Sequence, residues 1–250
     1  MRRWLLPAAV VAVLIAAWQA AASWGWTADA LNLEDFLVPS PSEIAQSLWV
    51  DRSLLADNGW VTLREVLAGF GCALAVGLLF AVLLHLSETA RRAVSPLIVA
   101  SQTLPIIAIA PILVIWFGYG VGPKLAIIAL ICFFPITVNT LDGLRSVDAD
   151  AVKMMRTLDA SRWQIFSRVE APTALPYAFS GANIAVAVAV IGAVFGEWSG
   201  SSSGLGWLMT RDTATLETAR LWASVVVLSL FAISLFGVLA LLERRVVRWR

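Results

Sequence analysis

Long apolar segments alternate with short polar ones along most of the chain. Six of the apolar segments approach the roughly 20 residues that a helix needs to cross the hydrocarbon core of a bilayer. These segments are residues 4–22, 66–84, 97–117, 125–141, 180–196 and 221–242. Prolines lie inside several of them, and membrane helices tolerate proline when neighbouring groups satisfy the freed carbonyls. The pattern predicts an all-α integral membrane protein with six transmembrane helices.

The composition agrees with that prediction. Hydrophobic residues make up 60% of the 250-residue chain and charged residues only 14%, whereas soluble domains average roughly 45–50% and about 25%. The net charge of +1 gives no sign of nucleic-acid binding, which favours strongly basic surfaces. Cys72 and Cys132 both fall inside apolar segments, so we expect small buried side chains there rather than a disulfide or a metal site.

The basic residues predict the orientation, because cytoplasmic loops of membrane proteins are enriched in Lys and Arg. With the N-terminus inside, the cytoplasmic segments hold most of the 18 Lys and Arg. Those segments are residues 1–3, 87–95, 142–176 and 243–250. Both termini are therefore predicted to be cytoplasmic. The expected parts are a first helix with its outer connector, a five-helix core and a basic tail, at residues 1–60, 61–242 and 243–250.

The first 60 residues leave one alternative open. Arg2 and Arg3, the apolar run and the small residues from Ala20 onward also fit a cleaved signal peptide. The length of the run and an even number of spans favour a retained helix. In the connector, Ser40 or Ser42 is the expected N-cap of a helix with proline in its first turn.

A charge-rich stretch, residues 147–176, interrupts the apolar pattern between the fourth and fifth spans. Asp148 is typical of a helix start, where a carboxylate faces the positive end of the helix dipole. Val152, Met155 and Leu158 then recur at intervals of three, which places them on one helical face. The stretch therefore begins with a short amphipathic helix.

A second amphipathic helix is predicted after a bend. Asp159 tolerates the left-handed conformation better than most residues, and Ser161 is a suitable N-cap. The apolar residues then recur at the same interval: Trp163, Phe166 and Val169. Two prolines are expected to end this helix before the fifth span: Pro172 and Pro176.

The apolar faces of these two helices are too short to cross a membrane. They leave three possibilities: packing against the protein's own spans, docking into a groove of a partner protein, or contact with lipid.

The arrangement resembles the cytoplasmic loop of permease subunits of ATP-binding-cassette importers. That loop begins with Glu-Ala-Ala, has Gly at its bend and closes with Ile followed by Leu-Pro. With the Gly aligned at Asp159, Lys153 stands in the place of the Glu, Val169 in that of the Ile and Pro172 in that of the Pro. The helix, the bend and the closing proline are present, whereas the acid and the Gly are not.

The resemblance extends over most of the chain. The segments "LVPSPSEI", "SQTLPIIAIAPILVIWFGYGVGPK", "FFPITVNTLDGLRSVD", "SRWQIFSRVEAPTALP" and "GEWSGSSSGLGWLM" are similar to the nitrate, sulfonate and taurine permease group. Within that group they are most similar to permeases assigned to pyrimidine precursors of thiamine, such as hydroxymethylpyrimidine, with riboflavin permeases nearby. The resemblance implies the type I importer permease fold in the plasma or inner membrane.

The resemblance also implies the partners. Two permease subunits form a homodimer in the lipid bilayer, two separate ATP-binding subunits hold ATP and Mg²⁺ below them, and an extracytoplasmic solute-binding protein delivers the substrate. No cofactor and no catalytic residue are then expected in this chain. Its residues agree, because they contain no G-x-x-x-x-G-K-[ST] phosphate loop.

In such a permease the charge-rich loop is the part that the ATP-binding subunits hold, and their closure tilts the spans. We therefore expect the loop to carry an ATPase-coupling surface with apolar anchors and polar partners. Its candidate residues are Asp150, Lys153, Met155, Arg156, Leu158, Asp159, Ser161, Arg162, Trp163 and Phe166.

Polar and aromatic residues inside spans or at their ends are candidates for the translocation pathway. They are Gln102, Thr103, Trp116, Asn183, Glu197 and Trp198. A pyrimidine would stack on one of the tryptophans and bond with Gln102. Alternatively, Glu197 lies at the water interface or pairs with Arg64 or Lys124. Two other functions are weighed against the importer: a stand-alone secondary transporter, which needs ionisable groups deep in the bundle, and a membrane enzyme, which needs a nucleophile with a base.

Overall fold

The structure is a computed structural model that describes residues 2–24, 34, 37–103 and 105–248. All of the regular secondary structure in these residues is helical, so the all-α prediction is confirmed. The chain divides into two compact units. We call Met1–Val61 with Ser203–Ser229 the connector unit, and Thr62–Ser202 with Leu230–Arg250 the core unit.

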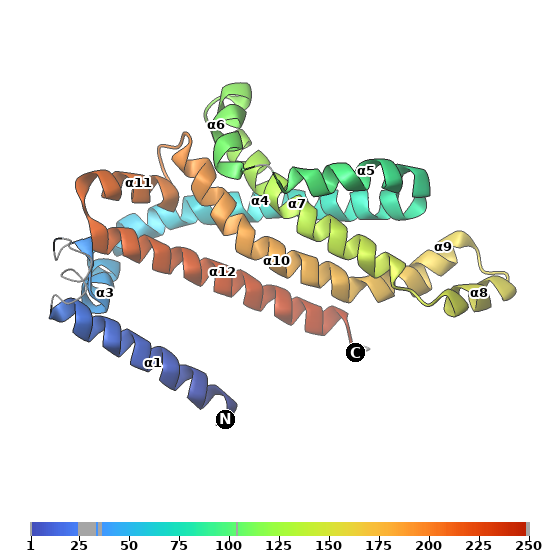
Figure 1. Ribbon diagram of the computed structural model, residues 1–250, viewed down its shortest axis with the longest axis horizontal. Coiled ribbons are helices and arrows are strands. Elements are labelled where there is room, and N and C mark those ends of the chain that lie inside the picture. The colour runs from blue at the N-terminus through green and yellow to red at the C-terminus, as the bar shows by residue number, and fades with distance from the viewer. Residues whose placement is uncertain (1, 25–33, 35–36, 104, 249–250) are drawn as a thin grey trace. The chain divides into compact units, whose positions relative to one another are not determined.

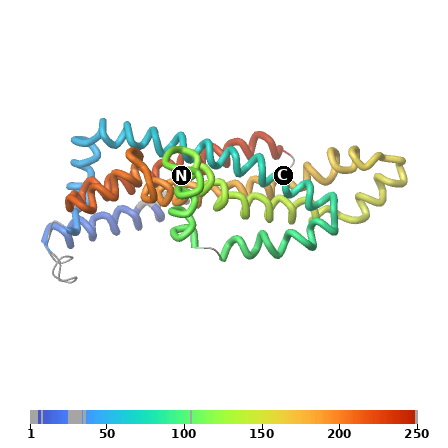
Figure 2. Tube along the Cα trace, turned by 90° about the horizontal axis from the view of Figure 1, so that it is seen from above, coloured from blue at the N-terminus to red at the C-terminus, as the bar shows by residue number. Residues whose placement is uncertain are grey.

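The core unit is built around two long helices, α7 (Val121–Arg145) and α10 (Ala171–Trp198). They lie side by side along most of their length (Figures 1 and 2). Small residues on α10 permit this close approach, as is usual where membrane helices meet. Those that are fully buried include Gly181, Ala182, Ala185, Ala189 and Ala193.

Three further helices pack on α7 at its two ends. The part of α4 (Arg52–Leu86) beyond Val61 and α5 (Glu88–Ser101) share an apolar cluster with the end of α7. Its buried members are Ala81, Leu84, Ile98 and Leu141. Near the start of α7, α6 (Ile106–Phe117) contributes Ala110 to a second cluster, with Ile127 and Ile131.

The contact between α7 and α10 predicts a stability effect at Gly181. A Cβ added there would lie 2.5 Å from the carbonyl oxygen of Pro135 and 3.2 Å from the Cα of Ile136. Because both are backbone atoms, neither can rotate away. We expect Gly181→Ala to lower the free energy of unfolding by about 1–3 kcal/mol, the usual cost of overpacking.

Thermal unfolding of the detergent-solubilised chain would measure this effect. Gly237→Ala is the matched control, because an added Cβ there has no atom within 4 Å. Equal melting temperatures of the two variants would contradict the close approach at Gly181.

The connector unit holds α1 (Arg2–Ser23), α3 (Pro41–Val50), α11 (Leu205–Thr215) and the first turns of α12 (Thr218–Val246). Ser40 and Glu43 form a reciprocal capping box at the start of α3, which confirms the predicted helix start. The side chain of Gln19 on α1 bonds to Ser42 at 3.0 Å. Trp18 packs on Trp222 with ring centroids 5.6 Å apart.

The predicted spans agree with the helices in most cases. Among the residues that the structure describes, four helical segments are long and apolar enough to cross a membrane: Arg52–Leu86, Val121–Arg145, Arg162–Trp198 and Thr218–Val246. The fourth and fifth spans are thus longer than the sequence predicted. The first predicted span coincides with α1. That α1 crosses the membrane, and that the chain has six transmembrane helices in total, stay predictions.

The third predicted span is wrong as a single helix. Residues 97–117 are divided between α5 and α6, whose axes differ by 102°. Gln102 and Thr103 donate to the carbonyls of Val99 and Ala100 at 3.1 and 3.0 Å, which tightens the last turn of α5. Pro105 has no N–H to continue the helix and lies at the N-cap of α6. Hydropathy alone does not reveal this bend.

Candidate functional site

The charge-rich stretch forms two short helices at one end of the core unit. α8 (Ala149–Thr157) follows α7, and α9 (Arg162–Ile165) leads back toward α10. Both helices lie beyond the ends of the α7 and α10 pair (Figures 1 and 2). The loop is therefore held away from the packed helices.

The local signals that predicted these helices are confirmed. The side chain of Asp148 accepts a bond from the backbone N–H of Asp150 at 2.9 Å. Asp159 has a φ of 55°, in the left-handed region. Ser161 caps α9 and forms a capping box with Gln164. Caps and bends of this kind depend on residues close in sequence, so the sequence alone predicts them.

The predicted end of the second helix is wrong. Pro172 and Pro176 do not stop it, because α9 continues through a π-helix, η2 (Phe166–Glu170), into α10. The backbone N–H of Ala171 bonds to the carbonyl of Phe166, five residues earlier. Pro172 then lies in the first turn of α10, where a missing N–H costs little.

The predicted coupling surface exposes large apolar side chains. Leu158 is 71% exposed and Trp163 is 72% exposed. Trp163 stacks on the half-buried Phe166 with ring centroids 5.7 Å apart. Met155 is half-buried, and its neighbour Met154, which the face pattern did not select, is exposed. One exposed hydrophobic anchor thus lies on each side of the bend at Asp159: Leu158 before it and Trp163 after it.

The polar members of the coupling surface are also accessible. Lys153 bonds to Asp150 at 2.9 Å on the surface of α8, and Arg156 is exposed. Arg162 is about half exposed and donates to Glu170 at 3.3 Å. Their role toward a partner stays a prediction.

Glu170 ties this loop to the end of α4. It is buried, and its carboxylate bonds to His85 Nε2 at 2.9 Å while the other oxygen accepts from Arg162. Ile165, which lies between Arg162 and Glu170 in the sequence, is also buried. The spacing of apolar residues that predicted the second helix did not single out Glu170. Glu170 and His85 are 85 residues apart, so no local pattern links them.

This tie predicts an effect on local stability. Glu170→Ala would leave His85 and Arg162 without their shared acceptor, and we expect a loss of about 1–3 kcal/mol. Hydrogen exchange should show faster opening of residues 162–176 than in the unsubstituted chain. Glu217→Ala, at a position remote in sequence and outside the core unit, is the control. Unchanged exchange in that segment would rule out the tie.

The candidate pathway residues do not form one cluster. Gln102 and Thr103 are exposed at the break between α5 and α6, whereas Trp116 is exposed near the far end of α6. Ten residue steps of helix, a rise of roughly 15 Å, separate Trp116 from Ile106 at the start of α6. Trp116 and Gln102 are therefore not placed to clamp one pyrimidine within a single chain.

The other pathway candidates lie on α10. Asn183 is half-buried, and its Oδ1 atom has no hydrogen-bond partner among the described residues. Trp198 is partly exposed and packs edge-on against Phe195. Contact of these residues with a solute stays a prediction.

Glu197 belongs to a buried polar cluster at the other end of the core unit from α8. It accepts a bond from Thr62 at 2.6 Å, and its carboxyl group lies against that of Glu65. Lys124 donates to Glu65 at 2.6 Å and to Ser201 at 2.7 Å. Glu197 is only 1% exposed, so the alternative that it lies in water is wrong. The cluster joins α4, α7 and α10.

The protein combines a core of long apolar helices with a protruding, charge-rich helical loop. The family model described as the binding-protein-dependent transport system inner membrane component matches residues 73–248. The chain belongs to this family. It is a permease component of an ATP-binding-cassette importer and a multi-pass membrane protein.

Two relatives of the permease have more specific names. It is 39% identical over 218 residues to the formylaminopyrimidine transport permease protein ThiX of Halalkalibacterium halodurans, covering 87% of each chain. It is 34% identical over 216 residues to the riboflavin transport system permease protein RibX of Chloroflexus aurantiacus, covering 86% of this chain and 81% of the relative.

A solved structure supports the fold. The permease has a TM-score of 0.64 and 21% identity to a chain of the MetNI methionine transporter, covering 79% of this chain and 96% of that one. The likeness confirms the predicted importer permease fold.

Proposed function

We propose that two copies of the permease form the translocation pathway for a small polar solute, driven by separate ATP-binding subunits that dock on α8 and α9. The exposed pair Leu158 and Trp163 is the observation that carries this proposal. Large apolar side chains held out from a packed core on a short helical loop are suited to helix-in-groove docking.

The tie at Glu170 explains how docking can move the spans. α9 continues without a break into α10, and Glu170 joins that junction to His85 at the end of α4. A force on α9 therefore reaches two spans directly. Nucleotide binding acts only through the difference in affinity for two permease conformations.

We place α8 and α9 in the cytoplasm, with both termini on the same side. Basic residues gather at this end of the core unit, where the positive-inside rule expects them. They include Arg91, Arg92, Arg145, Lys153, Arg156, Arg162 and Arg168. Cysteine accessibility in intact cells would test this, with Thr157→Cys protected from an impermeant thiol reagent and Trp49→Cys labelled.

For the substrate we propose a pyrimidine precursor of thiamine, such as hydroxymethylpyrimidine. The name of the ThiX relative, for formylaminopyrimidine, supports this choice. Riboflavin, named for the RibX relative, and taurine or other sulfonates, named for more distant ones, are the competing solutes.

Uptake by proteoliposomes would test both parts of the proposal. Vesicles holding the permease, its ATP-binding subunits and a solute-binding protein should accumulate labelled pyrimidine only with internal ATP. Calorimetric titration of the solute-binding protein with hydroxymethylpyrimidine, riboflavin and taurine would separate the substrates. No heat with any pyrimidine would refute the substrate, and uptake without ATP-binding subunits would instead indicate a secondary transporter.

A further inference from the structure

A groove between α5 and α7 lies at the end of the core unit that carries α8. Its cavity has a volume of about 740 Å³. The cationic part of its lining comes from both helices: Arg91 and Arg92 from α5, and Arg145 from α7. The solute pathway proposed above does not use this groove.

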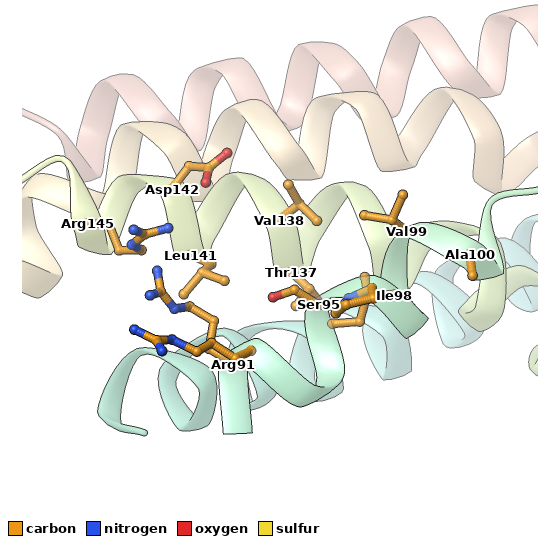
Figure 3. Close-up of a pocket in the computed structure, with 12 residues that line it drawn as sticks. Arg91, Ser95, Ile98, Val99, Ala100, Thr137, Val138, Leu141, Asp142 and Arg145 are labelled. Atoms are coloured by element: carbon orange, nitrogen blue, oxygen red, sulfur yellow. The ribbon is translucent and has the colours of Figure 1, made fainter. Parts of the chain in front are cut away.

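The three arginines outnumber the acids of the groove, whose lining includes one acid, Asp142. Arg145 and Arg91 extend toward the same space, whereas the carboxylate of Asp142 points away from them (Figure 3). Arg91 and Arg92 share the carboxylate of Glu88. The side chain of Arg145 makes no hydrogen bond or ion pair with any residue that the structure describes. Guanidinium groups that converge in this way favour an anion between them, and a phosphate matches their fork of donors.

Apart from Ser95, Thr137 and Asp142, the rest of the groove lining is apolar. Ile98 and Leu141 form its buried floor, while Val99 and Val138 are more accessible along its walls. The valines and isoleucine follow the two helices away from the arginines (Figure 3). One occupant therefore needs both an anionic head and an apolar tail.

We propose that the groove binds an anionic phospholipid. The phosphate lies between Arg91 and Arg145, and one acyl chain lies along Val99 and Val138. Basic pockets between membrane helices on the cytoplasmic side are suited to anionic headgroups. A free inorganic anion would satisfy the arginines but leave the apolar walls exposed. The proposal rests on the cytoplasmic placement of this end and not on the identity of the solute.

Lipid binding to the purified permease would test the proposal. Native mass spectrometry and thermal unfolding would compare phosphatidylglycerol with phosphatidylcholine of the same acyl chains. We expect the permease to retain phosphatidylglycerol, and we expect phosphatidylglycerol but not phosphatidylcholine to raise its melting temperature. Arg145→Gln should weaken that binding about fivefold, the factor that one arginine near a lipid headgroup contributes. Arg168→Gln, an exposed arginine outside the groove lining, should leave it unchanged.

A second variant separates a lipid from a small anion. Val99→Trp keeps every arginine and fills the apolar wall, so it should also weaken phosphatidylglycerol binding. Inorganic phosphate at the same concentration should not raise the melting temperature. Equal binding of the two lipids, an unchanged affinity in both variants, or stabilisation by inorganic phosphate alone would each overturn the proposal. Transport of the solute need not change for any of these results to hold.

Discussion

Replacing Leu158 and Trp163 together with Asp is expected to abolish ATP-driven uptake while leaving the permease folded. Both side chains are more than two-thirds exposed, so the free chain loses little packing when they are removed. In a docked complex each would place a carboxylate in an apolar groove without a partner, which is costly. Large exposed anchors of this kind commonly contribute at least about 2 kcal/mol each to an interface.

Co-purification with the ATP-binding subunits would measure the loss directly. Each single variant should weaken association roughly 30-fold, the factor that corresponds to such an anchor. Trp49→Asp is the matched control, because Trp49 has the same 72% exposure on α3. Trp163→Phe, which keeps an aromatic ring on Phe166, should retain most of the association. Full association of the double Asp variant would remove the basis for docking on α8 and α9.

Local sequence signals predicted the form of this loop well. Asp148, Asp159 and Ser161 each act on backbone within a few residues, so their effect does not depend on the rest of the fold. Hydropathy likewise placed the long spans, because the bilayer sets their length independently of how they pack. The continuation of α9 through η2 was not predicted. A π-helical turn shifts the backbone hydrogen bonds from four to five residues apart, and no particular residue type signals where this happens.

The ties between distant residues could not be predicted in the same way. Glu65 and Lys124 are 59 residues apart, and His85 and Glu170 are 85 apart. Each partner alone fits an ordinary interfacial position. Which of these residues meet depends on how the helices pack. A single sequence, read alone, holds no information about that packing.

One helix was missed altogether. α11 is short and only moderately apolar, so a search for spans passes over it. Three of its buried residues, Leu205, Leu208 and Asp212, do recur at intervals of three and four. That spacing is the signal of an amphipathic helix. Asp212 is paired with Arg220 at 2.7 Å, which accounts for a buried carboxylate.

Replacing Lys124 with Met is expected to give the largest loss of stability in the core unit. The side chains of Lys124 and Glu65 are only 6% and 4% exposed, and their charged atoms are 2.6 Å apart. Removing the amine leaves Glu65 buried beside the carboxyl group of Glu197 without a cation. Glu65 Oε2 already has no hydrogen-bond partner among the described residues. Breaking a buried ion pair from one side typically costs about 3–5 kcal/mol.

A double-mutant cycle would show whether that loss comes from the pair itself. Glu65→Gln with Lys124→Met removes both charges, so the double variant should be more stable than Lys124→Met and the two single losses should not add. The exposed pair of Lys153 and Asp150 is the control, since its side chains are 75% and 82% exposed at a similar distance of 2.9 Å. Solvent screens such a pair, and Lys153→Met should scarcely shift the melting temperature. If Lys124→Met and Lys153→Met shift it equally, burial is not what makes the Lys124 pair important. In that case the cluster of Glu65, Lys124 and Glu197 does not hold α4, α7 and α10 together.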